Sequence, residues 1–147
     1  MRYFTSLFFV FILAGCSTHP GIASENTEKG NALTKLWKSA ETAYNNQEWE
    51  DSFHLYSKLS EKLIDAEIEF KKGVSSFRTG RIKLAESSFE KAIEINPTHR
   101  KSLYNLAIIN MSRGYAFLHR YQNSLSPQER SKSLNDILEI LENFSEK

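Results

Sequence analysis

Two segments of the chain resemble each other at a spacing of 33 residues, and this repetition constrains the fold more than any other feature. Residues 47–56 read QEWEDSFHLY and residues 80–89 read GRIKLAESSF. Each segment has a turn, a large apolar residue, a small residue three positions later and an aromatic residue four positions beyond that. In an α-helix this spacing places all three side chains on one face. The pattern therefore predicts two copies of one helical unit, in which a small residue lets two helices approach closely.

The repeated unit resembles the tetratricopeptide repeat, a helix-turn-helix unit of about 34 residues. The better copy spans residues 66–99 and carries the family's small, turn, packing and closing residues: Gly73, Gly80, Ala85, Phe89, Ala92 and Pro97. The first copy, residues 33–65, is looser, because Gln47 replaces the turn glycine and Ser52 replaces the packing alanine. A third first helix begins near Arg100, but the match fails after Gly114. A generic helical bundle with coincidental similarity is the alternative.

The last segment has the pattern of an amphipathic helix. Ser126, Pro127 and Glu129 are typical of a helix start, with a serine cap, a first-turn proline and a capping-box glutamate. One apolar stripe follows, made of Leu134, Ile137, Leu138, Leu141 and Phe144. We expect this helix to cap the open end of the repeat stack, the alternative being a dimerisation or docking helix. The predicted fold is all-α: a short repeat solenoid of two repeats and a partial third at 32–112, then a degenerate remainder and capping helix at 113–147.

The N-terminal segment resembles the signal peptide of bacterial lipoproteins. Seven apolar residues, 7–13, follow Arg2 and lead into Leu13-Ala14-Gly15-Cys16, which is similar to a lipobox. The resemblance implies cleavage of residues 1–15 and attachment of acyl chains such as palmitate to Cys16, the single cysteine of the chain. An ordinary signal peptide is the alternative. Because Ser17 stands where an aspartate would favour the inner membrane, the resemblance further implies an outer-membrane, periplasm-facing location.

Residues 16–31 are predicted to form a flexible tether. They contain Gly, Pro and small polar side chains, with Ile22 as the single large apolar residue, and such a stretch buries too little surface to offset chain entropy. Without Arg2 the remaining chain has 18 basic and 18 acidic residues, because the full sequence has 19 and 18. This balance argues against a nucleic-acid partner, which calls for a basic face.

The repeat resemblance also implies where a partner would bind. In that family the first helix of each unit lines a concave face, so its groove positions transfer to matching residues of this chain. Those we expect to contact a protein or peptide partner are Trp37, Lys38, Tyr44, Phe70, Lys71, Phe77, Arg78, Lys101, Tyr104 and Asn105. Aromatic side chains would form the floor and cations would hold acidic groups. The alternatives are that these aromatic residues belong to the core, or that the tether or last helix fills the groove.

Catalytic chemistry is not indicated by the sequence. His19, His54, His99 and His119 lie far apart, and none forms a pair at metal-ligand spacing. There is no nucleophile-elbow serine and no glycine-rich phosphate loop. We expect no enzyme activity, no metal and no cofactor beyond the lipid at Cys16. The predicted function is a membrane-anchored adaptor or scaffold, an accessory or pilot factor of a cell-envelope machine. The alternative is a structural subunit of such a complex, bound through its convex face or last helix.

Overall fold

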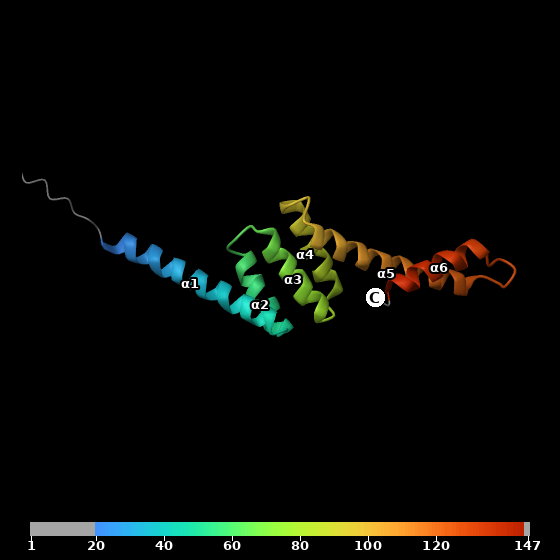
Figure 1. Cartoon of the computed structure of the whole chain (residues 1–147), viewed down its shortest axis with the longest axis horizontal. Helices are drawn as coiled ribbons and strands as arrows, with labels where there is room; N and C mark the ends of the chain where they lie inside the picture. Colours follow the sequence, from blue (N-terminus) through green and yellow to red (C-terminus); the bar gives the residue numbers. More distant parts are fainter. Residues whose placement is uncertain (1–19, 146–147) are drawn as a thin grey trace, which may run out of the picture.

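The computed structural model describes residues 20–145, and within that range the regular secondary structure is all helical (Figure 1). The helices follow one another along an elongated molecule, with α1 at one end and the α5–α6 hairpin at the other. Their bounds are α1 Pro20–Asn45, α2 Trp49–Ser60, α3 Ala66–Arg78, α4 Ile82–Ile95, α5 Arg100–Ser124 and α6 Lys132–Ser145. Among these described helices none combines the length and the apolar character needed to cross a bilayer.

Helices α1 to α4 form two successive hairpins, as the repeat pattern predicts. The repeated small and aromatic residues are buried in both copies: Ser52 and Tyr56 in α2, and Ala85 and Phe89 in α4. Around Tyr56 one apolar cluster gathers residues of α1, α2 and α3. Around Phe89 a second cluster joins α3, α4 and the first half of α5. The prediction of an all-α, repeat-like fold is confirmed.

A glycine permits a close contact between the two helices of the second repeat. A Cβ added to Gly73 in α3 would lie 2.6 Å from Cε1 of Phe89, well inside contact distance. Phe89 is itself fully buried, and its ring centroid lies 5.9 Å from that of Phe70. The small residue in α3 and the aromatic residue in α4 are therefore two parts of one packing contact.

The turns that close the two hairpins have the same left-handed backbone conformation. Gly80 has φ of 76° and Gln47, its counterpart in the first repeat, has φ of 62°. Glycine adopts this region freely, whereas a side chain with a Cβ is disfavoured there by about 1–2 kcal/mol. The loosened first repeat thus keeps the turn geometry of the second with a less suitable residue.

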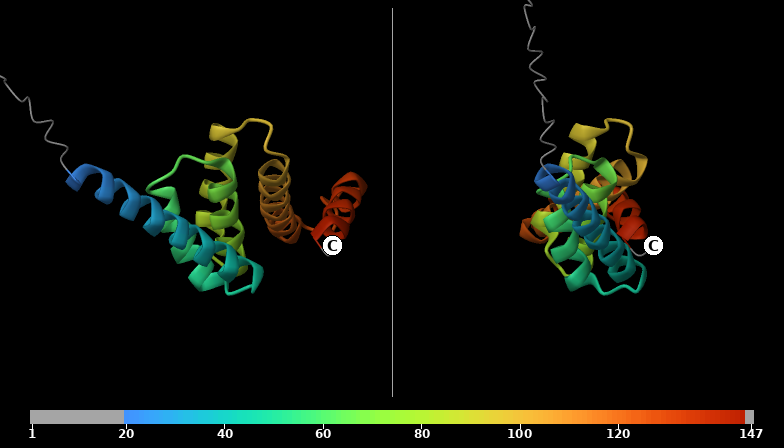
Figure 2. Two further views of the ribbon diagram at one scale, coloured as in Figure 1. Left: turned by 60° about the vertical axis from the view of Figure 1, so that its left-hand side comes forward. Right: turned by 90° about the vertical axis from the view of Figure 1, so that its left-hand side faces the viewer.

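The predicted flexible tether differs from the structure. From Pro20 onward these residues belong to α1, which extends beyond the other helices at its N-terminal end (Figures 1 and 2). Leu33 and Leu36 pack against the first apolar cluster and anchor the helix, and the residues before them contain no stop signal strong enough to end it. Pro20 occupies the first turn, where a proline costs no hydrogen bond. The tether expected at 16–31 is therefore wrong from residue 20 onward.

The third repeat also differs from its predicted form. Gly114 matches the family's turn position, but the chain continues through it as α5 to Ser124 and then folds back as α6. Glycine inside a helix costs about 1 kcal/mol, which the contacts of the following half of α5 with α6 can offset. Helix α6 packs on α5, and Leu138 is the buried residue among its described side chains, at 6% exposure.

The start of the last helix lies further along the chain than predicted. Glu129 accepts hydrogen bonds from Ser126 N–H at 2.9 Å and from Ser126 Oγ at 2.7 Å, so the expected capping contacts form. They close an isolated turn, however, and α6 begins at Lys132. Ser131 Oγ caps it by accepting from Leu134 N–H at 3.2 Å.

Candidate protein-binding surface

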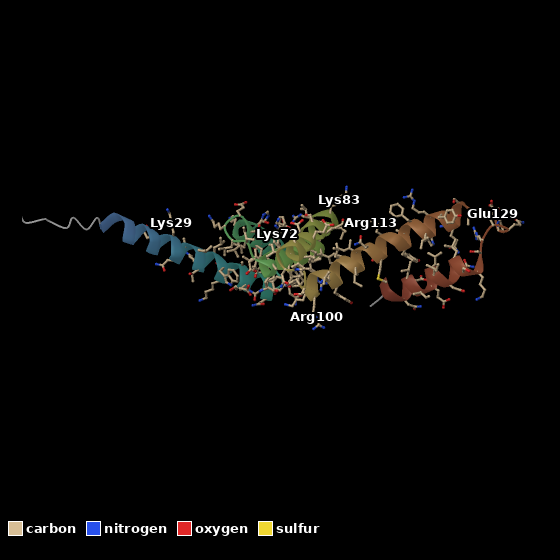
Figure 3. All side chains as sticks on the ribbon, turned by 90° about the horizontal axis from the view of Figure 1, so that it is seen from above. Lys29, Lys72, Lys83, Arg100, Arg113 and Glu129 are labelled. Atoms are coloured by element: carbon tan, nitrogen blue, oxygen red, sulfur yellow. The ribbon has the colours of Figure 1, made fainter. Side chains whose placement is uncertain are left out.

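A pocket of about 780 Å³ lies where α3 meets the start of α5. We call it the α3–α5 pocket, and its lining residues are Phe70, Arg100, Lys101, Leu103, Tyr104 and Asn105. Leu103 is 45% exposed and Tyr104 is 67% exposed, so two large apolar side chains stand at its rim. Figure 3 shows Arg100 at the first turn of α5. The pocket combines apolar surface with two cations, a composition that suits a protein side chain or peptide segment.

Phe70 forms the base of this pocket rather than an exposed contact. It is 7% exposed, and its ring centroid lies 5.3 Å from that of His99. The Lys101 ammonium lies 5.2 Å from the Phe70 centroid, within cation–π range. Phe70 therefore belongs both to the core of the second repeat and to the floor that the pocket presents.

Charged groups beside the pocket are fixed by a network between α3 and α5. His99 Nδ1 accepts a hydrogen bond from Ser102 N–H at 3.3 Å, which makes Nε2 the donor to Glu67 Oε2 at 3.2 Å. Lys101 Nζ donates to Glu67 Oε1 at 3.1 Å. Burial raises the pKa of Glu67, but the hydrogen bonds from Lys101 and His99 outweigh it and hold the pKa below the usual value. Lys101 is thus partly neutralised by the chain itself, while no ion pair of Arg100 is seen among the described side chains of residues 28–143.

A similar network joins α1, α2 and α3. Glu41 accepts from Lys71 Nζ at 2.6 and 2.8 Å and from Tyr56 Oη at 2.6 Å. Burial raises the pKa of Glu41, and the hydrogen bonds from Lys71 and then Tyr56 reverse that effect and lower it. Burial and the bond to Glu41 raise the pKa of Tyr56. Lys71 also lies 5.4 Å from the ring centroid of Tyr44, so its charge is held by the fold rather than offered to a partner.

The structure brings four of the ten predicted contact residues together in the α3–α5 pocket: Phe70, Lys101, Tyr104 and Asn105. Tyr44 and Lys71 lie together near Glu41. Arg78 stacks over the ring of Trp49 at 5.7 Å. Of the remaining predicted residues, Lys38 and Phe77 line two other pockets, and Trp37 lies on α1 one turn before Glu41.

Those remaining residues have separate surroundings. Lys38 lines a pocket of about 670 Å³ between α1 and α2, away from α3 and α5. Phe77 lines a pocket of about 370 Å³ with Ile82 of α4 and Ile109 of α5. Trp37 is 37% exposed on α1. None of these three residues lines the α3–α5 pocket.

The sequence analysis did not predict that Lys71 and Lys101 are paired with glutamates of the chain itself. Glu41 to Lys71 and Glu67 to Lys101 are both contacts from one first helix to the next, and both span about one repeat along the chain. This recurrence of a glutamate in one repeat and a lysine about one repeat later is the signal that could have revealed them. Two pocket residues, Arg100 and Leu103, were also not predicted.

The predictions on lipidation and on metal binding concern residues outside the binding surface described above. Cys16, the predicted lipidation site, lies outside the described residues. Among the side chains that the structure describes there is no group of three or more His, Cys, Asp or Glu placed to hold a metal ion.

Comparison with known protein families shows to which family the chain belongs. The coatomer epsilon subunit family matches residues 26–146, which include every described helix in whole or in large part. The chain belongs to the coatomer epsilon subunit family. No curated protein and no solved structure matches the chain significantly. This epsilon-family membership agrees with the helical-repeat architecture and indicates protein partners within a complex.

The family corrects the predicted location. Coatomer epsilon subunits are cytosolic components of a eukaryotic vesicle coat. The prediction of the periplasmic side of a bacterial outer membrane is therefore wrong. It rested on Ser17 and on the likeness of a short N-terminal segment to a lipobox, whereas the family match extends over most of the chain.

Proposed function

We propose that this epsilon-family chain is a protein-binding scaffold that holds a partner chain in the α3–α5 pocket. The observation that carries the proposal is the pocket itself, in which exposed Leu103 and Tyr104 stand over Phe70 beside Arg100 and Lys101. Aromatic and arginine side chains next to a desolvated apolar floor are typical of residues that dominate protein interfaces. The proposal includes no catalytic role and no cofactor, in line with the absence of catalytic motifs from the sequence.

The partner segment that fits this pocket carries an apolar side chain and a neighbouring carboxylate. The apolar side chain would lie between Leu103 and Tyr104, while the carboxylate would pair with Arg100, for which no carboxylate partner is seen in the described part of the chain. Because Arg100 and Lys101 form the first turn of α5, the positive end of the helix dipole adds to their attraction for an anion.

The test combines a pocket variant with a matched surface control. Leu103→Ala with Tyr104→Ala removes the rim, and Leu84→Ala removes a 48% exposed leucine of α4 that lines none of the three pockets described above. In-cell crosslinking with quantitative mass spectrometry measures how much partner protein is captured by the chain. The captured amount should fall at least about tenfold for the double variant and stay unchanged for the control. Unchanged capture by the double variant, with its helical circular-dichroism signal intact, would place the binding surface elsewhere.

Lipid attachment at Cys16 stays a second, separate proposal that the sequence alone supports. The likeness of Leu13-Ala14-Gly15-Cys16 to a lipobox is its basis. The hypothesis of an accessory factor for a cell-envelope machine depends on this anchor. Mass spectrometry of the chain isolated from membranes should show an acylated Cys16, and Cys16→Ser should abolish membrane fractionation. An unmodified thiol would remove the support for both the anchor and that hypothesis.

A further inference from the structure

The second half of α5 and the whole of α6 form a two-helix hairpin with an uncovered apolar side. α5 contacts the repeats through its first half, where Ser102 and Ile109 are buried, whereas its second half contacts α6. Four large side chains of the hairpin remain exposed: Phe117 at 62%, Tyr121 at 56%, Ile137 at 47% and Ile140 at 57%. We call these four residues the hairpin patch.

Helix geometry places the four residues on one side of the hairpin. Phe117 and Tyr121 are one turn apart on α5, and Ile137 and Ile140 are one turn apart on α6. Gln122 Nε2 donates to Asn135 Oδ1 and fixes the register of the two antiparallel helices. In that register Phe117 lies at the same height along the hairpin as Ile140. From the helical periodicity, the hairpin patch lies on the side of the hairpin opposite the Gln122–Asn135 hydrogen bond.

We propose that a second copy of this chain covers the hairpin patch, so that two α5–α6 hairpins form an antiparallel four-helix bundle. Two helices cannot enclose an apolar core, and pairing of two hairpins is the common way in which such elements bury one. With roughly 200 Å² for an aromatic side chain and somewhat less for isoleucine, the patch exposes about 400 Å². This is about the apolar share of the ~800 Å² that one partner contributes to an interface of standard size.

The charges of the two helices favour a second copy and select its orientation. In the second half of α5 the basic residues are Arg113, which pairs with Glu86 of α4, and Arg120, and there is no acidic residue. Helix α6 contains Asp136, Glu139 and Glu142 against Lys132 alone. A two-fold axis parallel to the helices places α5 of one copy over α6 of the other, and opposite charges meet. An axis across the helices would place α5 over α5, and like charges would meet. The structure therefore points to the parallel axis.

The parallel axis brings Arg120 of α5 close to Asp136 of the second copy at the edge of the patch. No ion pair of Arg120 is seen within the part of the chain that the structure describes. Asp136 pairs with Lys132 of its own helix at 3.2 Å, but both side chains are largely exposed and such a pair is weak. Each dimer would contain two Arg120–Asp136 contacts because the interface is symmetric.

Sedimentation of the full chain over a range of concentrations tests the dimer. Phe117→Glu with Ile140→Glu should raise the dimer dissociation constant by at least about tenfold, while Leu84→Glu on α4 should leave it unchanged. A chain that remains monomeric at micromolar concentration, or a dimer that the patch variants do not weaken, would overturn the proposal. The second outcome would show that another surface forms the dimer.

A charge exchange tests the orientation with variants that change exposed side chains alone. Arg120→Glu or Asp136→Arg alone should weaken the dimer, and the two together should restore it. Failure of the double exchange to restore association would exclude the parallel axis. Because neither residue lines the α3–α5 pocket, these results are independent of the proposed partner site.

Discussion

Replacing Gly73 by alanine should destabilise the fold because the structure leaves no room for a methyl group there. The new Cβ would meet Phe89 at 2.6 and 2.8 Å, and Phe89 is fully buried against Phe70. Overpacking a filled core costs about 1–3 kcal/mol. Alanine also gains about 1 kcal/mol over glycine inside a helix. The net expected loss in free energy of unfolding is therefore up to about 2 kcal/mol.

Gly114→Ala is the matched control for this substitution. Gly114 lies inside α5, and a Cβ added there meets nothing within 4 Å. This variant should gain up to about 1 kcal/mol from helix propensity alone. The difference between the two variants cancels that shared gain and measures the close contact, at about 1–3 kcal/mol.

Urea unfolding at pH 7 measures the difference. Far-ultraviolet circular dichroism reports all helices, and tryptophan fluorescence reports Trp37 in α1 and Trp49 in α2. Gly73→Ala should lower the midpoint in both signals, and Gly114→Ala should raise the circular-dichroism midpoint. Equal stability of the two variants would refute the close packing of α3 on Phe89.

Three further predictions follow from local geometry. Gln47→Gly should raise the free energy of unfolding by about 1 kcal/mol in urea titrations because glycine has no Cβ to disfavour the left-handed conformation at this position. Gly80→Ala introduces a Cβ at the equivalent turn and should lower the free energy of unfolding by a similar amount. Asp65 Oδ1 accepts from two backbone N–H groups at 2.8 and 3.1 Å, so Asp65→Ala should cost about 1 kcal/mol in the same titrations. Folding lowers the pKa values of Glu41 and Glu67 below 4.5. The two carboxylates therefore stabilise the folded state above about pH 4.5, and this contribution is lost as the pH falls through their pKa values in the folded state. Replacing both glutamates by glutamine should flatten the decrease of unfolding free energy between about pH 5 and 3, and an unchanged pH profile would contradict the two networks.

The parts of the fold that short sequence spacing determines were predictable. Ala85 and Phe89 lie one turn apart in a single helix, so their common face follows from the sequence alone. The same holds for Ser52 and Tyr56, which the structure buries in the equivalent place. Local periodicity thus determined the two hairpins and their core.

Features that depend on competing local preferences were not predictable. Gly114 occupies a position where a turn glycine belongs, yet α5 passes through it because contacts with α6 favour a continuous helix. Pro20 and the polar residues after it read as a tether, but α1 propagates back from the anchored Leu33 and Leu36. In each case packing remote from the residue overrides its own tendency.

The candidate site was only partly predictable because its charges pair across helices. Phe70, Lys101, Tyr104 and Asn105 were expected on one face and do share a pocket. The pairing of Lys101 with Glu67 depends on how one repeat is stacked on the next, since the two residues lie 34 positions apart. Sequence spacing alone does not fix that stacking, so the cations were expected to be free for a partner.

The most direct test of the scaffold function places a photoreactive amino acid in the α3–α5 pocket of the full chain in cells. At position Tyr104, which is 67% exposed at the rim, irradiation should yield a covalent adduct with one defined partner protein. At position Leu84 of α4, also exposed, it should yield none of that adduct. Equal crosslinking to the same partner at both positions, or no adduct at Tyr104, would contradict the proposed binding surface.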